Sequence, residues 1–448
     1  MAKDFVSRRT FVGTAGAGMA ALSAGRVSGA IGANEKVRFG LIGAGSRGNQ
    51  VLDTFLARND VECVAIADVD DRHAATTAEK VKSKKGNSPT TARDYRAMLD
   101  RNDLDCVVIA TPDHWHALPA IQAVMAGKDV YVEKPVAHNV AEGRAMITAA
   151  RKYNKIMAVG TQQRSSPHFQ EAVHDVKSGK IGKVFWIQTW NFENISPTGM
   201  GRYADSEAPA GVDYDRWLGP APSRPFNSNR FHLLFRWFFD YAGGMMSDWG
   251  VHLNDIALWA IDQKGPTSVY ATGGIVTTDD NRDTPDTLQV VYEFPGTTLT
   301  YSMRKGNGLK FNDHEYGILF CGTDGSLLLD RSGYEILPDT TTLPYGIREV
   351  HGDRPVRKID LKTKKVAGID GNPPHIENFV QCLRSREKPI CDVEIAHDST
   401  NTCHLGNIAY KTGRKLIWDP TTETFPNDPE ANKHLSREPR AGYELPKI

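Results

Sequence analysis

The stretch VRFGLIGAGSRG, residues 37–48, joins an apolar run of strand length to a turn with the spacing Gly-x-Gly-x-x-Gly. A helical pattern follows directly, and its apolar face carries Val51, Leu52, Phe55 and Leu56. A second apolar run, residues 61–67, ends in Asp68, 20 residues after Gly48. A strand, glycine turn, helix, strand and terminal acid in this order predict a dinucleotide-binding unit.

The glycines and the acid each have a mechanical role in such a unit. Gly43 makes the tight turn, Gly45 lets the backbone approach a pyrophosphate, and Gly48 lets the helix and strand pack closely. The free N–H groups at the start of the helix attract phosphate. Asp68 can accept hydrogen bonds from ribose hydroxyls and would repel a 2′-phosphate, which favours NAD over NADP.

Strands and helices continue to alternate beyond this unit. The strand-like stretches are 105–110, 130–132 and 156–159, and the helix-like stretches are 117–126 and 141–153. This alternation predicts an α/β fold, a doubly wound parallel Rossmann sheet over residues 36–160 that binds ligands at the carboxyl ends of its strands. The predicted cofactor-binding residues are Gly43, Ala44, Gly45, Ser46, Arg47, Gly48, Asp68, Thr111, Pro112, His116, Glu133, Lys134 and Gln162.

Two places in the chain carry candidate catalytic residues. Lys134 ends a predicted strand and precedes Pro135, which favours an extended backbone at the lysine. Such a lysine can hydrogen-bond a substrate hydroxyl beside a nicotinamide; the alternative is a solvated surface lysine. Asp248 and His252 are four residues apart, a spacing that places both on one helical face.

A histidine can exchange a proton near neutral pH, and a neighbouring carboxylate can orient it. One alternative for this pair is a helix-start carboxylate with a core histidine. Another is two ligands of a metal site, but the sequence has no third ligand at a spacing typical of such sites. His114 and His116 line the cofactor cleft or open the next helix, and a metal role is disfavoured. The aromatic run 231–241 forms core or the apolar wall of a sugar pocket.

Several of these pieces occur together in one known family. The chain resembles the glucose–fructose oxidoreductase, inositol dehydrogenase and rhizopine-catabolism family, written Gfo/Idh/MocA. The matching pieces, in family order, are residues 43–48, 111–116 (TPDHWH), 126–135 (AGKDVYVEKP), 160–164 (GTQQR) and 244–255.

The resemblance implies a Rossmann domain followed by a substrate-binding and oligomerisation domain, residues 161–417, with a large, open, mostly antiparallel sheet. It implies that Lys134, Asp248 and His252 surround the substrate at the nicotinamide, and that subunits pair through the second sheet into a homodimer or homotetramer. We expect Arg164 and Trp237 to bind substrate together with Asp248 and His252.

The second half of the chain supports this organisation independently. Residues 184–191, 267–275, 287–294 and 297–303 have strand character, and Pro295-Gly296 marks a hairpin turn. Residues 418–448 are rich in proline, asparagine and charge, and predict an extended arm over the surface or onto a neighbouring subunit.

The N-terminus has the layout of a twin-arginine signal peptide over residues 1–30. Arg8-Arg9 precedes a weakly apolar run rich in glycine, alanine and serine that ends in Ser28-Gly29-Ala30. A basic tail with a chance arginine pair is the alternative. The twin-arginine export machinery is therefore a predicted partner, and the mature protein is predicted to be periplasmic or otherwise exported.

Composition excludes several other classes. The 54 basic and 54 acidic side chains give a net charge of 0, which argues against a nucleic-acid binder. No run approaches about 20 apolar residues, so no transmembrane helix is expected. The six cysteines lack the close spacing of a zinc site or a disulfide scaffold, and no metal site is predicted. Cys63 and Cys106 lie in apolar runs and are expected to be buried thiols.

The predicted activity is hydride transfer between NAD and a secondary hydroxyl of a sugar or polyol. His252 would act as general base, Lys134 would polarise the oxygen, and Asp248 would orient His252 or hold a hydroxyl. Because free NAD is scarce outside the cytoplasm, an exported enzyme must keep its cofactor bound. The alternatives are a redox-neutral NAD-dependent glycoside hydrolase, acting through transient oxidation, elimination, hydration and reduction, and a non-catalytic sensor.

Overall fold

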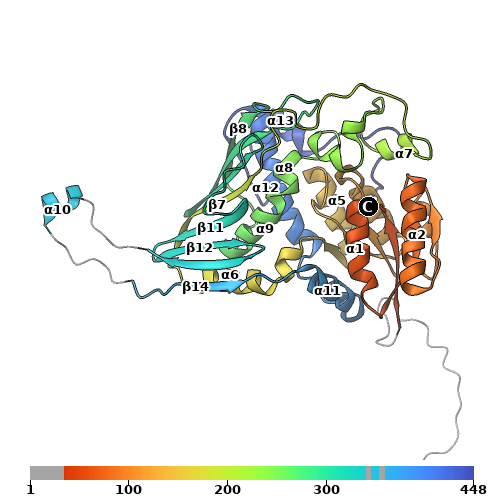
Figure 1. Ribbon diagram of the computed structural model, residues 1–448, viewed down its shortest axis with the longest axis horizontal. Coiled ribbons are helices and arrows are strands. Elements are labelled where there is room, and N and C mark those ends of the chain that lie inside the picture. The colour runs from red at the N-terminus through yellow and green to blue at the C-terminus, as the bar shows by residue number, and fades with distance from the viewer. Residues whose placement is uncertain (1–34, 340–344, 353–358) are drawn as a thin grey trace, which may run out of the picture.

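The computed structural model describes residues 35–339, 345–352 and 359–448, and shows two α/β domains side by side (Figure 1). The predicted signal peptide lies outside the described residues. In the first domain a six-stranded parallel sheet has the order β3-β2-β1-β4-β5-β6. Its strands are β1 (Val37–Ile42), β2 (Val61–Ala67), β3 (Thr90–Ala92), β4 (Cys106–Ile109), β5 (Asp129–Val132) and β6 (Met157–Val159).

Helices cover both faces of this sheet, as the alternation predicts. They are α1 (Ser46–Leu56), α2 (Asp71–Lys85), α3 (Arg96–Leu99), α4 (Ala117–Met125) and α5 (Val140–Lys152). Phe39 and Leu41 of β1 join the core beneath α1 and α2. Ile42 joins the core with α4 and α5 on the opposite face. The strand order reverses between β1 and β4, which is where a doubly wound sheet opens its ligand crevice.

One helix of this domain comes from far along the chain. In α11 (Asn372–Ser385), Phe379 packs edge-on against Phe55 and Tyr131, with ring centroids 6.3 and 5.5 Å apart. The predicted boundary at residue 160 therefore leaves out a helix that completes the core of the first domain, because only tertiary packing brings it there.

The second domain is built on a nine-stranded sheet of order β14-β13-β12-β11-β7-β10-β9-β8-β15. All neighbouring pairs in it are antiparallel except β7 with β10, in agreement with the mostly antiparallel sheet expected. The strands are β7 (Val184–Phe192), β8 (Ser268–Gly274), β9 (Thr287–Phe294), β10 (Thr297–Arg304), β11 (Tyr316–Gly322), β12 (Gly325–Asp330), β13 (Gly333–Pro338), β14 (Lys364–Ala367) and β15 (Leu416–Ile417).

Helices cover one face of this sheet and bury a large apolar core against it (Figure 1). The main ones are α6 (Pro167–Lys177), α8 (Gly244–Asp248), α9 (Gly250–Ile261) and α12 (Val393–Thr412). The short elements are α7 (Tyr214–Leu218), α10 (Tyr345–His351), α13 (Pro429–Asn432), and the 3₁₀ turns η1 (Asp113–Trp115), η2 (Gln162–Ser165), η3 (Ser228–Arg230), η4 (His232–Trp237) and η5 (Lys433–Leu435).

The C-terminal segment runs back over the first domain of its own chain. The Arg437 Nε donates to Glu142 Oε1 at 2.7 Å, and the Tyr443 ring packs edge-on against Trp115 at 5.5 Å. Figure 1 places the C-terminus in front of this domain. Of the two placements expected for the arm, the structure shows the one over its own surface.

Two further expectations concern cysteines and membrane spans. Cys63 and Cys106 are buried and unpaired, as predicted, and the other four cysteines are also free thiols. Within the described ranges, every helix is too short or too polar to span a bilayer.

Candidate active site

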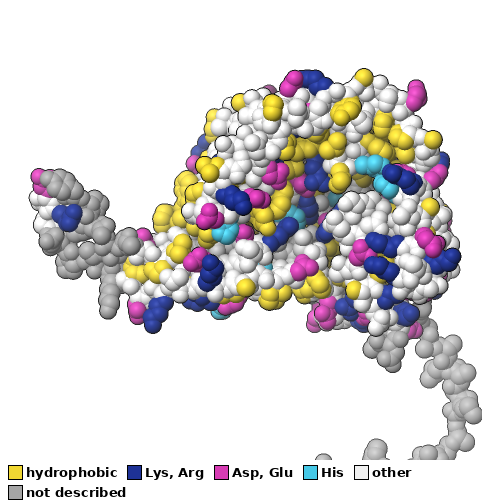
Figure 2. Space-filling view, in the orientation of Figure 1, with side chains coloured by type: hydrophobic (Ala, Val, Ile, Leu, Met, Phe, Trp, Pro, Cys, Tyr) yellow, Lys and Arg dark blue, Asp and Glu magenta, His cyan; other side chains and the backbone are white. Residues whose placement is uncertain are grey.

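A cavity of about 480 Å³ lies between the two domains, at the carboxyl ends of the parallel strands. Figure 2 shows the molecule hollowed on this face, with basic and histidine side chains gathered in the hollow. Most of the predicted site residues line the cavity: Gly43, Gly45, Ser46, Arg47, Asp68, Thr111, Pro112, Glu133, Lys134, Gln162, Asp248 and His252.

The glycine turn forms one end of the cavity. Gly43 has a φ of +89°, and a Cβ there would lie 2.8 Å from backbone atoms of Ala110 and Thr111. A Cβ at Gly48 would lie 2.0 Å from the carbonyl oxygen of Gly43. Helix α1 thus approaches the turn more closely than a side chain at Gly48 would permit. Gly43 therefore has the turn role and Gly48 the packing role that the sequence predicts.

Asp68 fixes the turn from the end of β2. Its Oδ2 accepts the N–H of Ala44 at 2.6 Å, and its Oδ1 accepts the N–H of Asp70 at 2.9 Å. Ala44, which was predicted to contact the cofactor, lies off the cavity wall, and its N–H is bonded to Asp68. Gly45 and Ser46 line the cavity at the start of α1, where N–H groups lack helical partners. This cradle fits the pyrophosphate of a dinucleotide.

Arg47 and Glu133 form an ion pair on the cavity wall, with Nη2 and Oε1 2.8 Å apart. Glu133 is almost fully buried at the end of β5, whereas a third of the Arg47 side chain is exposed. A Cβ at Gly160 would lie 2.6 Å from the same carboxylate oxygen, so the neighbouring strand end is also shaped around Glu133. Glu133 thus holds the guanidinium of Arg47, which belongs to the first turn of α1, near the place where phosphate would lie.

Lys134 and Asp248 meet across the domain boundary. The Lys134 Nζ donates to Asp248 Oδ1 at 2.6 Å and to the Asp248 backbone oxygen at 2.9 Å. Arg236 Nη1 donates to Asp248 Oδ2 at 2.8 Å. Burial alone would raise the pKa of Asp248, but Arg236 and Lys134 hold that pKa below its usual range. Asp248 is thus a charged acceptor that orients two cations.

His252 lies close by but on a separate helix. Asp248 ends α8 and His252 belongs to the first turn of α9, so the single continuous helix expected is interrupted at Trp249. Among the described contacts, the Asp248 oxygens bond Lys134 and Arg236 rather than His252, so Asp248 does not orient this imidazole. Burial, with the charge of Lys134, lowers the pKa of His252 well below its usual value, and its buried Nδ1 has no hydrogen-bond partner among the residues that the structure describes. His252 is a neutral base that can accept a proton.

Asp113 adds a second acid to the same wall. It begins η1 and lines the cavity. Burial raises the pKa of Asp113 to about 8, and the negative charge of Asp248 contributes in the same direction. Asp113 is therefore a protonated carboxylic acid at neutral pH, which can donate a hydrogen bond where Asp248 can only accept one.

The structure corrects three further predictions. Arg164 does not face the cavity, because its guanidinium forms a buried ion pair with Asp255 at 2.8 Å. Trp237 is a core residue whose ring packs 4.2 Å beneath the Arg282 guanidinium. His116 also lies off the cavity wall, with its two ring nitrogens 2.7 and 3.0 Å from the carbonyl oxygens of Pro135 and Thr111. It holds two site loops together rather than contacting a ligand.

Comparison with known proteins agrees with the fold and with the position of the cradle. Residues 37–161 match the family model described as an oxidoreductase family with an NAD-binding Rossmann fold. Residues 180–293 and 356–445 match the C-terminal alpha/beta domain of the same oxidoreductase family. The chain belongs to the Gfo/Idh/MocA oxidoreductase family.

Gfo/Idh/MocA relatives with assigned names include sugar and polyol dehydrogenases. D-glucoside 3-dehydrogenase of Escherichia coli is 29% identical over 39% of this chain and 49% of that protein. Inositol 2-dehydrogenase of Rhizobium meliloti is 27% identical over 54% of this chain and 59% of that protein. The chain thus spans about half the length of these curated relatives. The structure of levoglucosan dehydrogenase with NADH and levoglucosan has a TM-score of 0.64 at 17% identity, covering 86% of this chain and 99% of that one, and shows the shared fold.

Among the cavity residues that were not predicted from the sequence are Arg236, Asp113 and Arg331. Arg236 interrupts the aromatic run, and Asp113 lies inside the TPDHWH piece, so both had a local signal. Arg331 follows β12 and stacks 5.0 Å from the centre of the Trp249 ring, and no local motif marks it. In this Gfo/Idh/MocA protein the second domain supplies more of the cavity wall than its motifs indicate.

Proposed function

We propose that this protein is an NAD-dependent oxidoreductase that transfers a hydride to or from a secondary hydroxyl of a sugar or polyol. The observation that carries the proposal is the 2.6 Å contact between Lys134 Nζ and Asp248 Oδ1. This ion pair and the neutral His252 line the same cavity as the glycine cradle. NAD, when bound, supplies the hydride acceptor or donor.

The side chains on the cavity wall can perform the proton part of that reaction. Lys134 is held at a defined position by Asp248, and its ammonium can donate to the substrate oxygen and stabilise alkoxide character. His252 can take the hydroxyl proton as the C–H bond gives up its hydride. Asp113 and Arg236 can hold further hydroxyls, since one is a protonated acid and the other a cation. These groups and the ring of Trp249 suit a polyhydroxylated substrate.

The test measures turnover and cofactor binding separately. Purified protein with NAD would be screened for NADH formation against aldoses, glycosides and inositols, and compared with Lys134→Ala and His252→Ala. We expect NADH formation with at least one of these classes, lost in both variants while NAD affinity is kept. Turnover that persists in both variants would contradict the assignment of the site.

A second candidate, redox-neutral glycoside hydrolysis, is favoured by Asp113. An acid that is protonated at neutral pH beside Lys134 and Asp248 can donate a proton to a leaving glycosidic oxygen. Product analysis separates the two candidates. A free reducing sugar without net oxidation identifies hydrolysis, whereas a lactone or keto-sugar identifies oxidation.

We also propose export and self-association. The Arg8-Arg9 pair and the small-residue run ending at Ala30 support export by the twin-arginine route with NAD already bound.

Self-association is supported by exposed apolar side chains on the large sheet, namely Phe185, Trp186 and Tyr270, which suit the pairing of subunits through this surface. The nicotinamide content of exported, dialysed protein tests the first proposal; light scattering on Trp186→Lys beside the wild type tests the second.

A further inference from the structure

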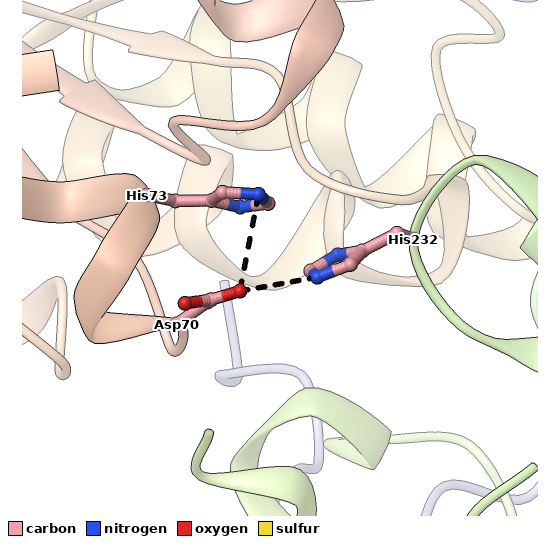
Figure 3. A group of neighbouring side chains, drawn as sticks. All are labelled: Asp70, His73 and His232. Atoms are coloured by element: carbon pink, nitrogen blue, oxygen red, sulfur yellow. Dashed lines mark hydrogen bonds and ion pairs between the residues drawn. The ribbon is translucent and has the colours of Figure 1, made fainter. Parts of the chain in front are cut away.

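Three potential metal ligands, Asp70, His73 and His232, gather where the two histidines line the cavity. Figure 3 shows His73 and His232 turned toward the same carboxylate oxygen of Asp70. The His232 Nε2 lies 3.2 Å and the His73 Nε2 3.8 Å from Asp70 Oδ2. One donor atom from each residue lies within 4.8 Å of the others. The three side chains therefore bring ligand atoms from both domains to one place.

The first two ligands belong to one helix start. Asp70 caps α2, where its Oδ1 accepts the N–H of Arg72 at 2.9 Å, which leaves Oδ2 to face the histidines. His73 lies three residues later, in the first turn, so both side chains share one face of the helix. The His73 Nδ1 faces Asp68 Oδ2 at 3.8 Å. A carboxylate behind a histidine, on the side away from a metal, is the usual outer partner of a metal-bound imidazole.

The third ligand comes from the second domain on an unusual backbone. His232 begins η4 with a φ of +50°, a left-handed conformation uncommon in residues other than glycine. Its ring packs against that of His73, with centroids 4.5 Å apart. The two domains are already joined here, because Asp71 N–H donates to Gly211 O at 3.0 Å and Asp213 N–H to Val69 O at 2.9 Å.

The donor chemistry selects the kind of ion. Two imidazole nitrogens and one carboxylate oxygen are a frequent three-ligand set for Zn²⁺, with a fourth position left for water. Bond lengths of about 2.1 Å place tetrahedral donors roughly 3.4 Å apart, near the separations from Asp70 Oδ2 observed here. Arg72 reaches this same oxygen at 3.5 Å, but three-quarters of its side chain is exposed, so it can turn into solvent.

We propose that Asp70, His73 and His232 bind a divalent transition-metal ion, with Zn²⁺ preferred, and that the ion ties η4 of the second domain to α2 of the first. The same η4 segment carries Arg236, which bonds Asp248. The ion therefore holds one wall of the cavity in place without contacting the reacting groups. This role is separate from the proposed hydride transfer.

The experiment measures Zn²⁺ binding to the full chain purified without a histidine tag. Metal is first removed with a chelator, and the protein then competes with a weak chromogenic chelator for added Zn²⁺. We expect one tight Zn²⁺ per chain, and at least a tenfold loss of affinity in His73→Ala and in His232→Ala. His174→Ala removes an exposed histidine on α6 and is the matched control, which should bind as the wild type does.

A second readout tests whether the ion joins the domains. Zn²⁺ should raise the midpoint of thermal unfolding of the wild type and of His174→Ala by several degrees, and should leave His232→Ala unchanged. The unfolding curves without metal also show whether each variant is folded. Absence of a stoichiometric Zn²⁺, binding that survives loss of either histidine, or binding without a shift in the midpoint would each overturn the proposal. None of these readouts requires a substrate, so the result is independent of turnover.

Discussion

Lys134 Nζ and Asp248 Oδ1 lie 2.6 Å apart across the boundary between the two domains. The lysine follows the strand β5 of the Rossmann sheet, and the aspartate ends α8 of the second domain, 114 residues later. Both side chains are mostly buried, at 14% and 17% exposure, which keeps water from competing strongly for the pair. The contact therefore positions the ammonium on the cavity wall and couples the two domains there.

Replacement of this lysine should separate chemistry from binding. We expect Lys134→Ala to lower kcat/KM by at least about 10²-fold, because the donor to the substrate oxygen is lost. NAD affinity, followed by fluorescence titration, should change by no more than about threefold. Lys447→Ala, which removes an exposed lysine near the C-terminus, is the control. Equal losses in the two variants would rule out a specific role for Lys134.

The neutral state of His252 predicts the acid side of the pH profile. A base is active when deprotonated, so activity falls as pH drops through its pKa. Burial lowers the pKa of His252 well below its usual 6.5. We therefore expect kcat/KM to stay constant as the pH falls to 6.5 and to decline only at lower pH. A decline centred at or above 6.5 would show that another group, or a differently placed His252, controls the reaction.

Asp113 should make folding stability depend on pH in the opposite sense to an ordinary aspartate. Its pKa is raised from 3.8 to about 8, so between these values the folded protein holds a proton that the unfolded chain has released. Its stabilising contribution is full below pH 3.8 and is lost progressively as pH rises toward 8, by up to about 1.4 kcal/mol per pH unit.

Asp113→Asn removes this proton and should flatten that part of the profile. Urea unfolding of both proteins at several pH values measures the difference in free energy of unfolding. The free energy of unfolding of the variant, relative to that of the wild type, should increase from pH 5 to pH 8 with about the slope expected for the release of one proton. Parallel profiles would mean that Asp113 is ionised in the folded protein.

The closeness of α1 to the glycine turn predicts a loss of cofactor binding. In Gly48→Ala the new Cβ would lie 2.0 Å from the Gly43 oxygen, so the turn or the helix must shift. We expect NAD affinity to fall by at least about tenfold. Gly346→Ala, where a Cβ meets no atom of the described residues within 4 Å, is the control and should bind NAD normally. Retained affinity in Gly48→Ala would show that the turn tolerates the shift.

Arg164 should matter for stability rather than for substrate binding. Its ion pair with Asp255 is almost fully buried, at 7% and 1% exposure, so Arg164→Met leaves an unpaired buried carboxylate. The expected cost is about 3 kcal/mol in free energy of unfolding. Adding Asp255→Asn should restore part of it. An unchanged stability with a raised KM would instead support the substrate role first predicted.

Local features of the site were predictable because each depends on neighbours in the chain. The glycine spacing, the acid at the end of β2, and the lysine before Pro135 are set by backbone geometry within a few residues. The strand and helix alternation places their side chains at one edge of the sheet. The sequence thus predicted the family and both domain architectures, and most of the site residues it predicted line the cavity.

Contacts between distant segments depended on packing that no local pattern encodes. Asp248 bonds Arg236 and Lys134 instead of orienting His252, and Arg164 turns inward to Asp255. Asp70 and His73 meet a histidine that lies more than 150 residues further along the chain, a separation far longer than the short spacings by which a metal motif is recognised in a sequence.

By itself, then, the sequence determined the Rossmann unit, its cradle for a dinucleotide and the approach of Lys134, Asp248 and His252 to one cavity. Only the tertiary structure decided which charges pair there and where a second cluster forms. The physical reason is that hydrophobic periodicity specifies each element and the face it buries, whereas the partner of a buried charge is set by how the two sheets and their helices pack against each other.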